Sequence, residues 1–176
     1  DFGPTAFGDG IGFTLTNATG NKIDNYLGGT VDYRVHLDRD RGIVDGTLTL
    51  TLTNSSPTTG WGSGVIGNEL GLPVGTNRTW LSIYTALPAT RVVIDGVDEG
   101  ARRTTEHGWW VSSRRLDIAP GDTVEVVVTV LGTIGADDAY RLMVRNPPLV
   151  RPFTVTVDVD GQLLGAPIST AGTFRF

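Results

Sequence analysis

"DTVEVVVTV", residues 122–130, has valine at every second position from 124 to 130, and threonine or glutamate fills most of the positions between. Because successive side chains of a β-strand point to opposite faces, this alternation predicts a strand with one buried face. We therefore expect Val126 and Val128 to lie at the centre of a hydrophobic core.

The same alternation recurs in other parts of the chain. Four further segments show it clearly: "TVDYRVHL" at 30–37, "TLTLTLT" at 47–53, "YRLMVRN" at 140–146 and "FTVTVDV" at 153–159. Shorter runs rich in aromatic and β-branched residues are typical of strands as well: "GFTLT", "RTWLSIYT", "RVVID", "WWVSSRRL" and "TFRF". The pairs Asp95–Gly96 and Asp160–Gly161 predict tight turns, since both residue types tolerate positive φ.

This pattern predicts an all-β fold. About nine or ten short strands, with no sustained helical periodicity, are typical of a sandwich or a barrel. One-sided alternation needs a second sheet to cover the apolar face, which favours an immunoglobulin-like antiparallel β-sandwich. With 176 residues, 39% of them hydrophobic, we expect a single domain over residues 1–176, in which residues 1–29 form an N-terminal strand and an entry loop packed on it.

Composition narrows the classes of partner. The net charge is −5, and the fourteen basic residues are scattered, so no basic stripe is available for nucleic acid. The chain has no cysteine, which rules out disulfides and thiolate metal sites. No apolar run approaches the roughly 18 residues of a membrane span, so we expect no membrane insertion by this segment. The sequence begins without methionine or a signal peptide, and we expect a mature fragment or excised domain.

Two polar segments are candidates for ligand binding. "NATGNKIDNYL", residues 17–27, is either a structural entry loop or a ligand loop, with Asn21 and Asn25 as amide donors. Residues 55–77 form a long Gly- and Ser-rich loop, which is either a crossover between sheets or a binding loop. Trp61 lies there between two glycines, and we expect it to be the most exposed ring of a carbohydrate site that also draws on Trp109 and Trp110.

Candidates for catalysis and metal binding are weaker. Glu106 and His107 adjoin the tryptophan pair and form the best acid–base couple, so a hydrolase is a lesser alternative. Asp38, Asp40 and Asp45 surround Gly42 as in a calcium loop, but no bidentate glutamate follows and neighbouring arginines offset the charge. An ordinary polar hairpin is the default there, and we predict no catalytic residues, no metal and no cofactor.

Several segments, taken in order, resemble a known bacterial family. They are "NATGNKIDNYL" followed by "VDYRVHL", then "GTLTLTLTNSSP", "GTNRTWLSIYTAL", "HGWWVSSRRLDIAPGDTVEVVVTVLG" and "YRLMVRNPPLVRPFTVTV". Over residues 11–160 the chain resembles the C-terminal extracytoplasmic region of the domain of unknown function 4012 family of high-GC Gram-positive bacteria. The resemblance implies an actinobacterial cell-surface protein tethered by a region outside this fragment, and it supplies no catalytic residues.

These observations lead to two functional expectations. The first is a non-catalytic, extracytoplasmic β-sandwich module of a membrane-anchored protein, used for presentation or protein contact at the cell envelope. The alternative is a carbohydrate-binding module for envelope or exported polysaccharide, and a hydrolase using Glu106 and His107 ranks below both.

Overall fold

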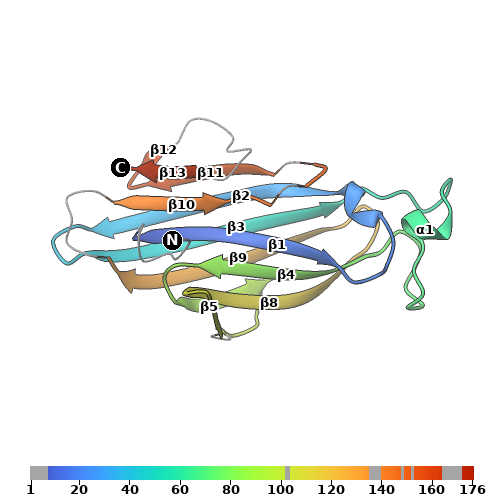
Figure 1. Ribbon diagram of the computed structural model, residues 1–176, viewed down its shortest axis with the longest axis horizontal. Helices are drawn as coiled ribbons and strands as arrows, with labels where there is room; N and C mark the ends of the chain where they lie inside the picture. The colour runs from blue at the N-terminus through green and yellow to red at the C-terminus, as the bar shows by residue number, and fades with distance from the viewer. Residues whose placement is uncertain (1–7, 102–103, 135–139, 148, 152, 164–171) are drawn as a thin grey trace.

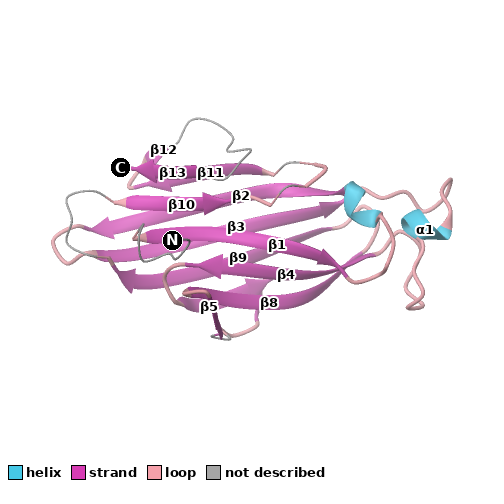
Figure 2. Ribbon diagram, viewed as in Figure 1, coloured by secondary structure: helices cyan, strands magenta, loops and turns pink. Residues whose placement is uncertain are grey.

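A computed structural model describes residues 8–101, 104–134, 140–147, 149–151, 153–163 and 172–176. Its strands form two stacked sheets that run along the long axis of the molecule (Figure 1). In the part of the chain that is described, helical turns occur at one end only (Figure 2): the 3-10 helix η2 at Ile23–Tyr26 and α1 at Ser63–Ile66. Within the described ranges, no helix is long and apolar enough to cross a membrane. The predicted all-β sandwich is confirmed.

The first layer is a six-stranded sheet. Its spatial order is β13 (Gly172–Arg175), β10 (Arg141–Arg145), β1 (Asp9–Asn17), β4 (Asn77–Thr85), β8 (Trp109–Ile118) and β7 (Thr104–Glu106). The second layer is a seven-stranded sheet. Its order is β12 (Gln162–Leu163), β11 (Thr154–Val159), β2 (Leu27–Asp38), β3 (Ile43–Asn54), β9 (Thr123–Thr133), β5 (Ala89–Ile94) and β6 (Val97–Asp98).

The sheets differ from the expected ones in two respects. They are mixed rather than wholly antiparallel, because β1 pairs with β10 and β2 pairs with β11 in parallel. Side-chain alternation is the same in both kinds of pairing, so the sequence pattern does not distinguish them. The described chain also has thirteen strands rather than nine or ten. Three of the additional strands, β6, β7 and β12, have only two or three residues, too few to show alternation.

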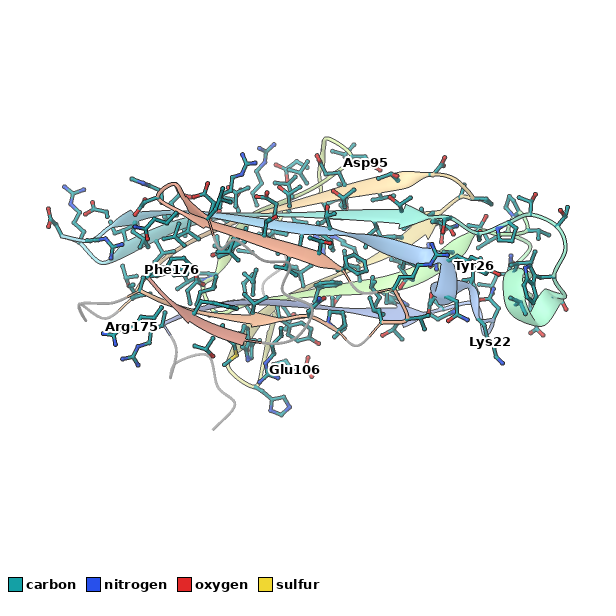
Figure 3. The ribbon with its side chains drawn as sticks, turned by 90° about the horizontal axis from the view of Figure 1, so that it is seen from above. Lys22, Tyr26, Asp95, Glu106, Arg175 and Phe176 are labelled. Carbon is teal, nitrogen blue, oxygen red and sulfur yellow. The ribbon has the colours of Figure 1, made fainter. Side chains whose placement is uncertain are left out.

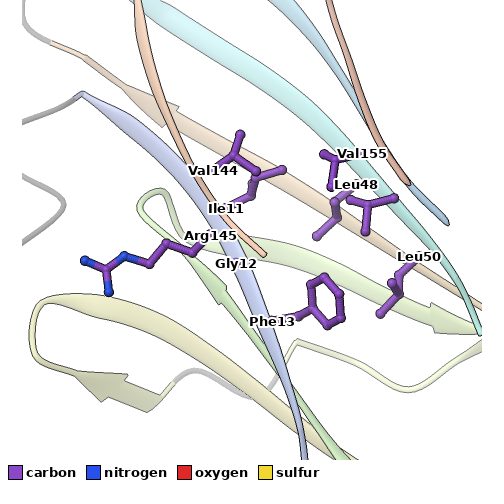
Figure 4. A pocket seen from close by; sticks show the side chains of 9 residues that line it. Ile11, Gly12, Phe13, Leu48, Leu50, Val144, Arg145 and Val155 are labelled. Atoms are coloured by element: carbon purple, nitrogen blue, oxygen red, sulfur yellow. The ribbon is translucent and has the colours of Figure 1, made fainter. Parts of the chain in front are cut away.

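The core lies between the sheets and consists of the alternating residues. Val126 and Val128 are 1% and 0% exposed, as predicted. The inward leucines of β3 and the inward side chains of β2 pack in the same cluster. Figure 4 shows one cavity in this core, of about 10 Å³, lined almost entirely by apolar side chains. It is about the volume of a single water probe, so it has no room for a larger ligand.

One carboxylate is buried in this core. Asp9 of β1 accepts hydrogen bonds from the hydroxyls of Tyr33 at 2.8 Å and Tyr140 at 2.5 Å. Burial raises the pKa of Asp9, and the hydrogen bonds from the two tyrosines and from the Gly10 N–H lower it in part. Gly46 leaves the room for the Tyr33 hydroxyl, since a Cβ there would lie 2.5 Å from that oxygen. The cluster therefore joins the two sheets through polar groups inside the core.

Candidate functional site

The hairpin between β7 and β8 ends in a tight turn that shapes the candidate site. His107 has φ 49° and Gly108 has φ 82°, the two consecutive positive values of a type I′ turn. This turn pairs Glu106 of β7 with Trp109 of β8. Directly paired residues point to the same face of a sheet, so the carboxylate and the indole lie side by side on the outer face of the six-stranded sheet.

On that outer face, the Trp109 ring packs against the backbone of Gly10, which has no side chain. It is only 6% exposed. A Cβ added at Gly10 of β1 would lie 2.7 Å from a carbon of the Trp109 ring, closer than real Cβ contacts come. Gly12, two positions further along β1, is also closely approached, since an added Cβ would lie 3.0 Å from the Cβ of Arg145. The two glycines of β1 thus leave the space that the indole and the neighbouring groove occupy.

A groove of about 430 Å³ lies beside this indole, and we call it the hairpin groove. Its lining residues come from β1, β4, β10 and the β7–β8 hairpin: Gly12, Phe13, Thr14, Tyr84, Glu106, His107, Trp109 and Arg145. In Figure 3, Glu106 and Asp95 lie on opposite sides of the sandwich. Figure 4 shows the side chain of Arg145 extending away from the apolar core side chains. The groove has the volume of a small-molecule site.

The polar groups of the hairpin groove are of both signs. The Tyr84 hydroxyl donates a hydrogen bond to Glu106 Oε2 at 3.2 Å. Partial burial, and then the negative charge of Glu106, raise the pKa of Tyr84, so its hydroxyl stays protonated and acts as a donor. His107 and Arg145 are both exposed at the rim. The groove therefore combines aromatic rings with carboxylate, hydroxyl, imidazole and guanidinium groups.

The structure places the other predicted site residues apart from this groove. Trp61 is 60% exposed, as expected, but it lies in the loop before α1, at the end of the sandwich that also carries Lys22 and Tyr26 (Figure 3). Trp110 is half-buried and pairs with Thr85 of β4, so it points to the opposite face from Trp109. The hairpin groove thus brings together Glu106, His107 and Trp109 alone among the predicted residues.

The entry loop is held together by its own side chains. Asn17 Oδ1 accepts hydrogen bonds from the backbone and hydroxyl of Thr19, both at 2.7 Å. The Asn21 amide donates to the carbonyl of Gly67, which ties the loop to the α1 segment, and its oxygen accepts from Thr19 at 2.7 Å. Asn25 is exposed in η2. The donor of Asn21 is thus engaged within the protein, which favours the structural interpretation of this loop.

The aspartates of the 38–45 hairpin are not gathered into a cluster in the described residues. Asp38 accepts a hydrogen bond from the Arg41 backbone at 3.1 Å, and Asp45 lies on β3 opposite His36. Across the described ranges, no group of three or more His, Asp or Glu side chains is placed to hold a metal ion. The calcium-loop alternative for Asp38, Asp40 and Asp45 is therefore not supported, because these side chains do not converge.

A second depression, of about 340 Å³, lies on the outer face of the seven-stranded sheet. Two of its polar side chains contact each other, His36 Nδ1 and Asp160 Oδ1, at 3.0 Å. Its lining residues include no Phe, Tyr or Trp: Arg34, Val35, His36, Asp45, Thr47, Asp158, Asp160 and Gly161. It therefore offers no Tyr or Trp ring for stacking, unlike the hairpin groove.

Sequence reasoning missed several residues of the hairpin groove. Thr14, Tyr84 and Arg145 belong to three different strands, and only the sheet order and register bring them to the hairpin. One signal was present: Gly10 and Gly12 occupy alternate positions of a strand, where glycine often marks the close approach of another group.

Comparison with known proteins found no match by sequence and a distant similarity in structure. Neither the family models nor the curated proteins matched this chain. Among solved structures, the chain is similar to a proposed nutrient-binding protein from Legionella pneumophila, with a TM-score of 0.47 and 6% sequence identity. The similarity covers 86% of this chain and 54% of that chain, so this chain spans about half of that protein.

Proposed function

We propose that this chain is a non-catalytic binding module of a cell-surface protein, and that it binds carbohydrate in the hairpin groove. The observation that carries the proposal is the combination of Trp109 and Tyr84 with Glu106, His107 and Arg145 in one groove of about 430 Å³. Sugars have apolar ring faces that stack on aromatic side chains, and hydroxyls that need both donors and acceptors. The groove supplies all three.

Binding suits the groove better than hydrolysis does. Glycoside hydrolysis generally uses two carboxylates that flank the scissile bond. Glu106 is the one carboxylate in the described lining, and it already accepts the Tyr84 hydroxyl. A groove at the surface of a sheet supports weak association, roughly micromolar to millimolar. The placement outside the cytoplasm is part of the proposal and is supported by the resemblance to the surface-protein family.

One further observation favours a second candidate function, protein contact at the envelope. Three large apolar side chains are well exposed in the loop around α1: Trp61, Leu70 and Val74. Exposed apolar groups gathered in one segment are typical of interaction surfaces. In this case the module would present that loop to a protein partner, and the hairpin groove would be incidental.

Titration of the folded protein with an oligosaccharide panel separates the two candidates. The panel contains oligomers of glucose, N-acetylglucosamine, mannose and galacturonic acid. We expect metal-independent binding of at least one oligomer, weakened by Tyr84→Ala and unchanged in the matched control Trp61→Ala. Loss of binding in Trp61→Ala alone, or no binding to any oligomer at millimolar concentration, would contradict the groove as the sugar site.

A further inference from the structure

The outer face of β4 continues the hairpin groove toward the other end of the sheet. Side chains of β4 alternate, so that Leu81 and Ile83 are buried in the core. Trp80, Ser82 and Tyr84 occupy the intervening positions and point outward (Figure 1 shows the strand). Tyr84 lines the hairpin groove, whereas Trp80 is 47% exposed and lies outside it. Trp80 and Tyr84 are four positions apart along the strand, which is a backbone rise of roughly 13 Å.

Hydroxyl groups cover the sheet between the two rings. The register places Ser82 opposite Thr14 of β1 on one side and Ser113 of β8 on the other. The hydroxyls of Ser82 and Ser113 are 2.8 Å apart. These three side chains are uncharged. Arg115 of β8 lies opposite Trp80 and Arg145 lines the groove, so basic groups stand at the two ends of this row and not along it, and they form no continuous line for a nucleic-acid backbone.

The surface therefore consists of a groove with an aromatic wall, a neutral hydroxyl-bearing floor and a second exposed aromatic ring, all in one line. We infer that the ligand is an extended glycan chain, which lies along β4 from the hairpin groove to Trp80. A single sugar ring in the groove does not reach Trp80, whereas a longer chain contacts the groove, then the hydroxyl row, and then the Trp80 ring. This inference rests on the proposed carbohydrate function and adds the length and path of the ligand.

Calorimetric titration with oligosaccharides of increasing length tests the inference. The probes are the disaccharide to the hexasaccharide of each sugar in the panel. We expect affinity to rise with length, with the longest oligomer bound about tenfold more tightly than the shortest, a typical contribution of one aromatic contact. Trp80→Ala should remove this gain and leave disaccharide binding unchanged. Trp80→Phe keeps a ring and should retain most of the gain.

The outcomes separate this inference from the proposed function. Equal affinity for all lengths, or an unchanged length dependence in Trp80→Ala, would overturn the extended path and leave binding in the groove intact. No binding of any oligomer, or disaccharide binding that Tyr84→Ala leaves unaltered, would overturn both. Circular dichroism of each variant confirms that the substitution has not unfolded the sandwich, which is expected because Trp80 lies on the surface.

Discussion

The Tyr33 hydroxyl donates a 2.8 Å hydrogen bond to the carboxylate of Asp9, and the two residues belong to opposite sheets. Both side chains are almost completely buried. The contact is therefore a polar link between the two layers, in a core built mainly from aliphatic and aromatic side chains.

Removal of this hydroxyl tests the link. Tyr33→Phe leaves the ring in the core but deprives a buried carboxyl group of a donor, which should lower the free energy of unfolding by about 1–3 kcal/mol. Urea unfolding gives this value. Tyr26→Phe is the matched control, because the Tyr26 ring lies half-buried below the Arg151 guanidinium. An equally small effect of both substitutions would show that the link contributes little.

The buried carboxyl group also predicts a pH dependence of stability. Burial raises the pKa of Asp9 above its ordinary value of 3.8. The folded state then binds more protons than the unfolded chain between these two pKa values, so stability from this group falls as pH rises through that window. Asp9→Asn does not titrate. The unfolding free energy of the wild-type protein relative to Asp9→Asn should therefore decrease from about pH 4 toward neutrality.

Other carboxylates do not change the difference in unfolding free energy between the wild-type protein and Asp9→Asn. Hydrogen bonds from Arg78 lower the pKa of Asp117, and those from Arg91 lower the pKa of Asp98, so both groups stabilise the fold above the ordinary pKa and lose that effect in acid. Because they are present in both proteins, their contributions cancel in the comparison. A relative stability that stays flat or increases with pH would refute the raised pKa.

The central valines of β9 should be sensitive to truncation. Val126→Ala and Val128→Ala each remove buried methyl groups and leave a small cavity, at a cost of about 1–3 kcal/mol. Val97→Ala provides the control, since Val97 is exposed. The urea midpoint measures all three. Negligible shifts for both core variants would mean that the inward face of β9 has been misassigned.

Much of the sandwich could be predicted from the sequence because its long strands have one solvent-exposed face and one buried face. Tyr33, Leu50, Val128 and Val157 all lie in the core, as their alternation predicts. Met143 departs from this rule: it lies at an outward position of β10 and is still buried, next to Gly10 in the register. Alternation describes which face a side chain takes, and it does not show what else covers that face.

The hairpin groove was only partly predictable for a related reason. Glu106, His107 and Trp109 are neighbours in sequence, so their proximity could be expected. Tyr84 reaches them through the β4–β8 pairing, and Arg145 through the further β1–β4 and β1–β10 pairings, the last of which is parallel. Strand order and register depend on contacts between distant segments, which local patterns do not encode.

The glycine under Trp109 gives a prediction for the groove itself. Gly10→Ala places a Cβ where it would lie 2.7 Å from the Trp109 ring, so the ring must move or the strand must shift. We expect a loss of about 1–3 kcal/mol of stability from overpacking, with a red shift of tryptophan emission and weaker sugar binding. Gly64→Ala, which has open space around the new Cβ, is the control. Unchanged emission and binding in Gly10→Ala would disprove this seating of the indole.

The four tryptophans offer the most direct test of the central claim, because each gives its own indole N–H signal in the spectrum of isotope-labelled protein. The protein is titrated with each hexasaccharide of the panel, and single Trp→Phe variants assign the signals. The account predicts that the signals of Trp109, in the hairpin groove, and Trp80, along β4, move together with one binding constant, whereas that of Trp61 stays in place. Movement of the Trp61 signal alone, or of none of the four, would contradict it.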